Sequence, residues 1–189
     1  MNLLSKSRLV IWGAFIVMIL SGISACKEDN IINKINIFSI EDDIKLGKQL
    51  DDQIAADPAT YPILSESQYP KAYEHIRRIT NTLLNSGKIK YKDKFAWQIK
   101  IIKDDTTLNA FCAPGGYIYV YTGIIKYLDD ESMLAGVMGH EIAHADRRHS
   151  TDQLTRKYGV DFLLGLLLGN NQNAIAGIAE GLGTLAYLS

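Results

Sequence analysis

The stretch Glu131–His149, ESMLAGVMGHEIAHADRRH, decides how the rest of the chain is interpreted. Three of its apolar residues recur at intervals of four, the spacing of one helix face: Leu134, Met138 and Ile142. Asp129 can cap a helix here, and the two acidic residues after it favour the positive end of the helix dipole. The pattern therefore predicts a long helix that begins after Asp129 and runs to about His149.

This helix carries a His-Glu-x-x-His pattern, formed by His140, Glu141 and His144, all expected outside the apolar stripe. Residues four apart lie on one side of a helix, so both imidazoles can reach one metal ion. A carboxylate beside zinc can take a proton from bound water and return it to a leaving amine. We predict His140 and His144 as ligands of one Zn²⁺ per chain and Glu141 as the general base. The alternative is a surface helix with two histidines by chance.

The remaining sequence predicts a mostly helical α+β domain with a small β-sheet. Ser39 can cap a helix that ends before Pro58, and a second helix is expected from about Pro70 to Asn85. Alternating apolar residues predict a strand at 95–103, and a run of β-forming residues predicts another at 117–121. Residues 109–116 between them are expected to form a hairpin or loop. Two more helices are expected at about 151–168 and 173–188. Helices, a small sheet and further helices are typical of an α+β fold.

The first residues of the chain have the pattern of a signal peptide. Lys6 and Arg8 precede an uncharged apolar run at 9–20, which is shorter than the roughly 20 residues that span a bilayer. The segment closes as Ile23-Ser24-Ala25-Cys26, which resembles the lipobox of bacterial lipoproteins. We predict a signal peptide at 1–25, a lipidated Cys26 with a polar tether at 26–38, and a peptidase domain at 39–189. The alternative is an uncleaved anchor or an ordinary cleaved signal.

A lipidated Cys26 bears on the location of the protein and on the state of Cys112. The residue after Cys26 is Lys27 and not Asp, so by the same resemblance we expect a lipoprotein of the outer membrane that faces the periplasm or the cell surface. Cys112 is then a lone thiol that packs as a small apolar side chain, whereas a disulfide between the two cysteines is the alternative. The formal net charge is −1, and no basic stripe with interleaved aromatic residues is present, so we do not expect nucleic-acid binding.

From about Ile37 onward the sequence resembles the M48 family of zinc metallopeptidases, especially its exported, lipoprotein-type members. The resemblance is carried by the segments 109–116, 120–125 and 140–149. It implies a zincin-like domain in which Asn109, Ala110, Phe111 and the following strand line the cleft. An extended substrate strand can pair with the exposed edge there through main-chain hydrogen bonds. The alternative for residues 109–116 is a hairpin without a role in binding.

The resemblance breaks at the third zinc ligand. Family members take it from a glutamate in an E-x-E-A-D-like motif on a later helix, and this sequence contains no such motif. We therefore expect the sequence to be partial, with the peptidase domain incomplete at its C-terminus; the alternative is that Glu180 serves as a substitute ligand. Another class of zinc protease has a third histidine six positions after the second, but Ser150 stands there. Arg148 and His149 are instead expected to stabilise the helix end or nearby carboxylates.

These observations favour a zinc-dependent metalloendopeptidase that hydrolyses peptide bonds in envelope proteins, in protein quality control. Its partners are then unfolded or misassembled envelope polypeptides, and the lipid on Cys26 attaches the domain to the membrane. The second hypothesis is a catalytically impaired lipoprotein that binds unfolded polypeptides through the peptidase cleft. A third is a purely structural envelope lipoprotein, which the His-Glu-x-x-His pattern disfavours.

Overall fold

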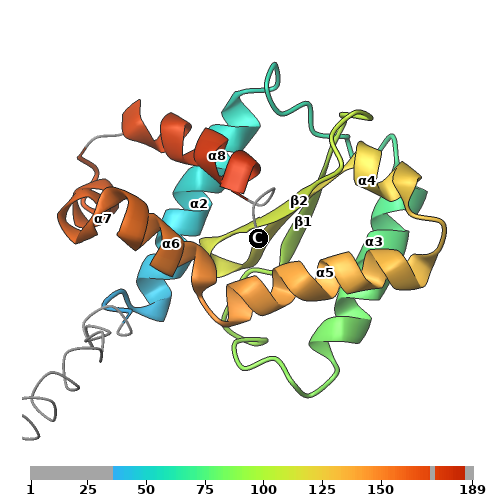
Figure 1. Cartoon of the computed structure of the whole chain (residues 1–189), viewed down its shortest axis with the longest axis horizontal. Helices are drawn as coiled ribbons and strands as arrows, with labels where there is room; N and C mark the ends of the chain where they lie inside the picture. Colours follow the sequence, from blue (N-terminus) through green and yellow to red (C-terminus); the bar gives the residue numbers. More distant parts are fainter. Residues whose placement is uncertain (1–35, 171–172, 186–189) are drawn as a thin grey trace, which may run out of the picture. The chain divides into compact units, whose positions relative to one another are not determined.

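Three short strands form a mixed sheet in the order β1-β3-β2. Figure 1 shows this sheet beside α5 (Glu131–Asp146). β1 (Gln98–Ile102) runs parallel to the central β3 (Tyr117–Tyr121), and β2 (Ala110–Ala113) pairs with β3 in antiparallel register. A 3₁₀ turn, η2 (Pro114–Gly116), joins β2 to β3. Both of its glycines have positive φ, 73° and 84°, which glycine adopts without steric cost. The predicted hairpin and the predicted strand at 117–121 are therefore confirmed.

The computed structural model describes residues 36–170 and 173–185. The predicted signal peptide, the lipidation of Cys26 and most of the tether lie outside these residues. Residues 37–189 form one unit, separate from residues 1–36.

The described part of this unit contains seven helices, α2 (Ile40–Ala56), α3 (Pro70–Leu84), α4 (Thr122–Tyr127), α5 (Glu131–Asp146), α6 (His149–Tyr158), α7 (Val160–Leu167) and α8 (Asn173–Leu185). Ser39 caps α2 as predicted: it accepts from the Asp42 N–H, and the Asp42 carboxylate accepts from the Ser39 N–H. The mostly helical α+β class is confirmed.

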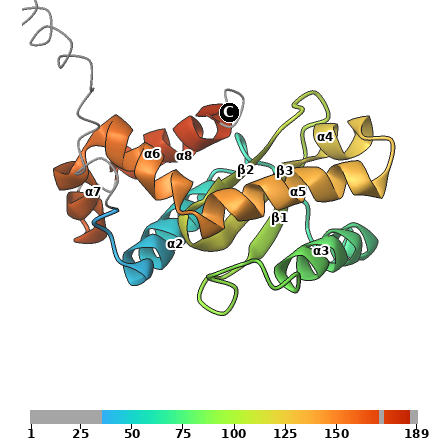
Figure 2. The ribbon, with the colours of Figure 1, turned by 60° about the horizontal axis from the view of Figure 1, so that its bottom comes forward.

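The two faces of the sheet carry separate apolar clusters, because successive side chains of a strand point to opposite sides. On β3, Tyr119 belongs to one cluster with α2, α6, α7 and α8, whereas Ile118 and Val120 belong to the other with α3 and α5. The helices thus cover the sheet on both faces (Figure 2). Cys112 lies on the α5 side as a buried free thiol, in keeping with the expected apolar packing.

Several predicted boundaries were wrong. The strand expected from residue 95 begins only at Gln98, since Trp97 has a φ of 45° that interrupts extended backbone. The helix expected at 151–168 is divided into α6 and α7 by Gly159, whose φ is 84°. Asp130, not Asp129, caps α5, and α5 ends at Asp146 rather than near His149. In the part of the chain that the structure describes, no helix has the length and apolarity needed to cross a membrane.

Candidate metal centre

The core holds α5 by one face and leaves its histidines accessible. The three predicted core residues Leu134, Met138 and Ile142 are buried against the sheet and α3. The Asp130 side chain accepts from the Met133 N–H at 2.9 Å and closes the first turn. His140 is exposed and His144 half-buried. The helix therefore presents an imidazole pair with one exposed and one half-buried member, on the same side of α5 as the four-residue spacing predicts.

The two imidazoles meet at the nitrogens that a zinc ion would use. His140 Nε2 lies 2.9 Å from His144 Nε2, and the ring centroids are 4.4 Å apart. Two nitrogens bound to one tetrahedral zinc at the usual distance of about 2.0–2.1 Å lie roughly 3.3 Å from each other. A rotation of either ring that moves its Nε2 by a few tenths of an ångström closes this difference. The pair therefore fits two ligand positions of a zinc site.

Glu141 is buried, with 8% of its surface exposed, and this differs from its expected place outside the apolar stripe. Burial disfavours the charged form and raises the pKa of Glu141 to about 7. Packing against the core thus removes the Glu141 carboxyl from water, directly next to His140 in the sequence.

A third protein ligand is not found among residues 36–170 and 173–185. No group of three or more His, Cys, Asp or Glu side chains there could hold a metal ion. Glu180, the substitute ligand considered above, lies on α8 and lines a hollow of about 240 Å³ together with Asp57 and Tyr61. The described residues therefore supply two imidazoles and a neighbouring carboxyl, and Glu180 does not complete the set.

The turn after α5 brings a third imidazole to the pair. Arg148 has left-handed backbone, with φ 61° and ψ 28°. Its side chain forms an ion pair with Asp43, in keeping with the expectation that Arg148 stabilises a nearby carboxylate. His149, the first residue of α6, places its Nδ1 3.2 Å from Nδ1 of His144. Sequence reasoning missed this contact, since residues five apart do not share a helix face. The sequence signal was the concentration of histidines at 140–149.

The predicted substrate-binding segment lies on the outer strand β2. Ala110 and Phe111 are both buried, and the Asn109 carbonyl accepts from the Tyr121 N–H at 3.1 Å. The Phe111 ring stacks on Tyr119, with centroids 4.7 Å apart, on the sheet face opposite α5. The Phe111 side chain thus belongs to the core on the face of the sheet opposite α5, so the predicted role of this segment in substrate binding does not involve that ring.

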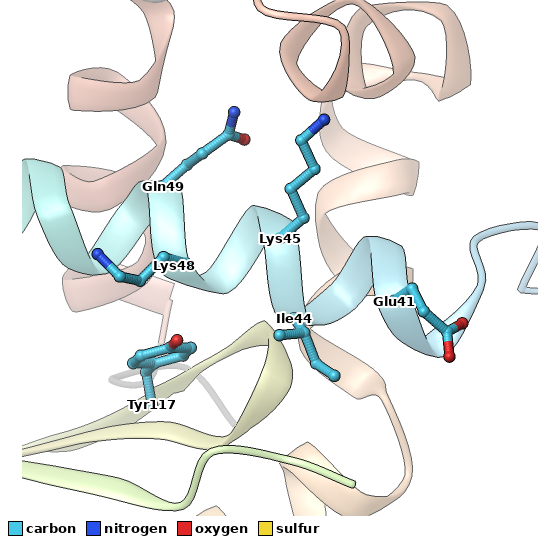
Figure 3. Close-up of a pocket in the computed structure, with 6 residues that line it drawn as sticks. All are labelled: Glu41, Ile44, Lys45, Lys48, Gln49 and Tyr117. Carbon is cyan, nitrogen blue, oxygen red and sulfur yellow. The ribbon is translucent and has the colours of Figure 1, made fainter.

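A second hollow, of about 430 Å³, lies beside α2 (Figure 3). It is lined by Glu41, Ile44, Lys45, Lys48, Gln49 and Tyr117. Lys45 Nζ donates to the Leu167 carbonyl at 2.5 Å, and Gln49 Nε2 donates to the Leu166 carbonyl at 3.3 Å. These hydrogen bonds hold α2 against the end of α7. Because the lining includes neither the imidazole pair nor Glu141, we assign this hollow no part in the candidate centre.

Comparisons with known proteins agree on one family. Mitochondrial metalloendopeptidase OMA1 of Schizosaccharomyces pombe is 41% identical over 58 residues, which cover 31% of this chain and 17% of that protein. The human metalloendopeptidase OMA1 is 36% identical over 67 residues, or 35% of this chain and 13% of the relative. The beta-barrel assembly-enhancing protease of Escherichia coli is 36% identical over 84 residues, or 42% and 17%.

Each of these matches spans less than a quarter of the relative's length. The family model described as peptidase family M48 matches residues 70–188, which include β1 to β3, the imidazole pair and the turn at Arg148. The His-Glu-x-x-His pattern at His140–His144 lies within this match, on α5, a helix whose other face is buried beside the sheet. The chain therefore belongs to peptidase family M48.

Proposed function

We propose that this chain carries the catalytic helix of a zinc-dependent metalloendopeptidase. The observation that carries the proposal is the approach of His140 Nε2 and His144 Nε2 to 2.9 Å, with the buried Glu141 between them in sequence. Membership of family M48, whose relatives are named metalloendopeptidases, supports the same assignment. A histidine pair with a neighbouring carboxyl is the part of a zinc-peptidase site that the His-Glu-x-x-His pattern supplies, namely two of the metal ligands and the general base.

Each residue has a defined task in this proposal. His140 and His144 hold the ion through Nε2, and the ion, when bound, supplies Lewis-acid polarisation and lowers the pKa of a bound water. Glu141 takes a proton at its carboxylate and later gives it to the departing amine. Asn109, Ala110 and Phe111 offer main-chain groups along the edge of β2 to an extended polypeptide.

Substrate and location form the finer part of the proposal. Proteins of the bacterial envelope are the proposed substrates, in unfolded or misassembled form. The lipobox-like segment ending at Cys26 supports an outer-membrane lipoprotein, and the name of the Escherichia coli relative, a beta-barrel assembly-enhancing protease, agrees with an envelope setting. Zinc is proposed as the metal because imidazole nitrogen suits it and family M48 is metal-dependent.

A second function is favoured by the incomplete ligand set. Two imidazoles without a third protein ligand hold zinc weakly, and the described residues contain no third. A chain in this state would bind unfolded polypeptides along β2 without cleaving them. This is the catalytically impaired, polypeptide-binding lipoprotein.

Cleavage of unfolded casein with and without a chelator separates the two functions. We expect cleavage that the chelator abolishes, and a loss of about 100-fold or more in Glu141→Gln, which removes the general base. Zinc content measured on the same samples should be retained in Glu141→Gln, because the imidazoles are unchanged. Glu131→Gln is the matched control, an exposed carboxyl on the same helix, and should keep wild-type activity. Casein binding without cleavage supports the second function, and cleavage that survives both chelator and Glu141→Gln contradicts the proposal.

A further inference from the structure

His149 contacts His144 at the ring nitrogen that does not face His140. Its Nδ1 lies 3.2 Å from Nδ1 of His144, while Nε2 of His144 lies 2.9 Å from His140. The rings of His144 and His149 are nearly perpendicular, at 78°, with centroids 5.0 Å apart. His144 therefore uses one nitrogen toward His140 and the other toward His149.

The residues on both sides of His149 are held by hydrogen bonds to other parts of the chain. Arg148 Nε donates to Asp43 Oδ2 at 2.5 Å, and its Nη2 donates to the Phe38 and Ser39 carbonyls at 2.5 and 3.0 Å. Asp43 is 1% exposed, so this anchor lies in the core. The left-handed backbone of Arg148 thus turns the chain back toward α5 at a defined angle.

The two residues after His149 are anchored as well. Ser150 Oγ donates to the Cys112 carbonyl on β2 at 2.7 Å, and Thr151 Oγ1 donates to Asp43 Oδ1 at 2.7 Å. Both residues are buried. His149 is the residue in this turn that faces His144, so the turn is built to hold an imidazole in that place.

The chemistry of a metal-bound imidazole assigns the direction of this hydrogen bond. A neutral imidazole that binds through Nε2 carries its proton on Nδ1, and such a ligand almost always donates that proton to a neighbouring acceptor. Nδ1 of His149 is the group in position to accept it. We propose that His149 is a positioning residue: it accepts the Nδ1–H of His144 and thereby holds Nε2 of His144 toward the metal. This inference rests on the proposed zinc function.

The same geometry argues against His149 as the third ligand. The two nitrogens of an imidazole point to different sides of the ring, and His149 faces the nitrogen of His144 that points away from His140. One ion cannot lie between His140 and His144 and also reach Nδ1 of His149 in this arrangement. His149 is therefore assigned to the outer shell, as the orienting partner.

Zinc affinity of the full chain, measured by competition with a chromophoric chelator, tests the assignment. His149→Phe keeps an aromatic ring in place but removes the acceptor, and we expect zinc affinity to fall 10- to 100-fold, the usual loss for an outer-shell partner. His149→Asn places an acceptor oxygen as many bonds from Cα as Nδ1, so its affinity should stay within about threefold of wild type. His75→Phe on α3, an exposed histidine paired with Glu131, should leave affinity unchanged.

Urea denaturation of the metal-free proteins shows whether each variant folds; should His149→Phe not fold, His149→Ala takes its place with the same expectation. Visible spectra of the Co²⁺-loaded forms give the second readout. A positioning role predicts that His149→Asn keeps the wild-type band shape, since no ligand is lost.

Three results would overturn the inference: unchanged zinc affinity in His149→Phe, equal loss in His149→Asn and His149→Phe, or a Co²⁺ spectrum altered by His149→Asn. Wild-type protein that takes up neither metal would contradict the proposed function itself, which is a separate outcome.

Discussion

Arg148 and Asp43 form a buried ion pair that ties the turn after α5 to the first turns of α2. Asp43 is 1% exposed and also accepts from Thr151, so its charge is balanced by Arg148 inside the core. Removing one partner of such a pair leaves an uncompensated buried charge, which costs far more than the loss of an exposed pair.

We predict that Arg148→Ala lowers the free energy of unfolding by about 3–5 kcal/mol, measured by urea denaturation. Arg77→Ala is the matched control, because Arg77 pairs with Glu66 on the surface, where water screens the charges. Equal losses in the free energy of unfolding from the two substitutions would show that the buried Arg148–Asp43 pair stabilises the fold no more than an exposed pair does.

Glu141 shows what residue-level reasoning can and cannot predict. Its identity and spacing from the histidines predict a general base, and both were available from the sequence. Its burial depends on neighbours supplied by other elements, and the resulting pKa of about 7 follows from that burial. The pattern therefore predicts a general base at this position, whereas the burial of its carboxyl group is a property of the packed core.

At the scale of elements, α2 and η2 approach so closely that only glycine fits between them. A Cβ on Gly47 would lie 1.9 Å from the Pro114 carbonyl oxygen. That oxygen belongs to the backbone of the turn leading into β3, so it cannot move without shifting the central strand. Gly47 thus sets the distance between α2 and the sheet.

Gly47→Ala is expected to destabilise the protein by at least about 1–3 kcal/mol, because the methyl group overpacks a rigid contact. Gly136→Ala on α5 is the counterpart: nothing lies within 4 Å of its Cβ position, and alanine in an exposed helix stabilises by about 0.5–1 kcal/mol. Urea denaturation of both variants should give shifts of opposite sign. A neutral or stabilising effect of Gly47→Ala would contradict the close approach of α2 to η2.

For the whole molecule, zinc binding and folding are linked if His140 and His144 hold the ion. A ligand that binds only the folded state stabilises it by about 2.7 kcal/mol at 100 times its Kd. For a chain of 189 residues this corresponds to a rise in Tm of roughly 5–10 °C.

Calorimetry with zinc and then with excess chelator checks this prediction. The rise in Tm should reverse on chelation and should be absent from the His140→Ala, His144→Ala double variant. A Tm that does not respond to zinc in the wild-type chain, or responds equally in the double variant, would remove the link between the imidazole pair and metal binding.

The sequence by itself determined most of the helices and strands and the pairing of His140 with His144. Helix hydrogen bonds and caps involve residues within about four positions, so Ser39 starts α2 and the four-residue spacing aligns His140 with His144 without help from distant parts of the chain. The strand at 117–121 followed from its β-forming residues in the same local way. The match of the M48 family model to residues 70–188 is likewise a property of the sequence.

Only the tertiary structure decided how that pair is surrounded. Asp43 lies 105 positions before Arg148, yet this ion pair accompanies the left-handed turn that brings His149 to His144. The burial of Glu141 and the contact between Gly47 and Pro114 likewise depend on elements far apart in the chain. Desolvation and close packing are set by which surfaces meet in space, and no local periodicity encodes that meeting.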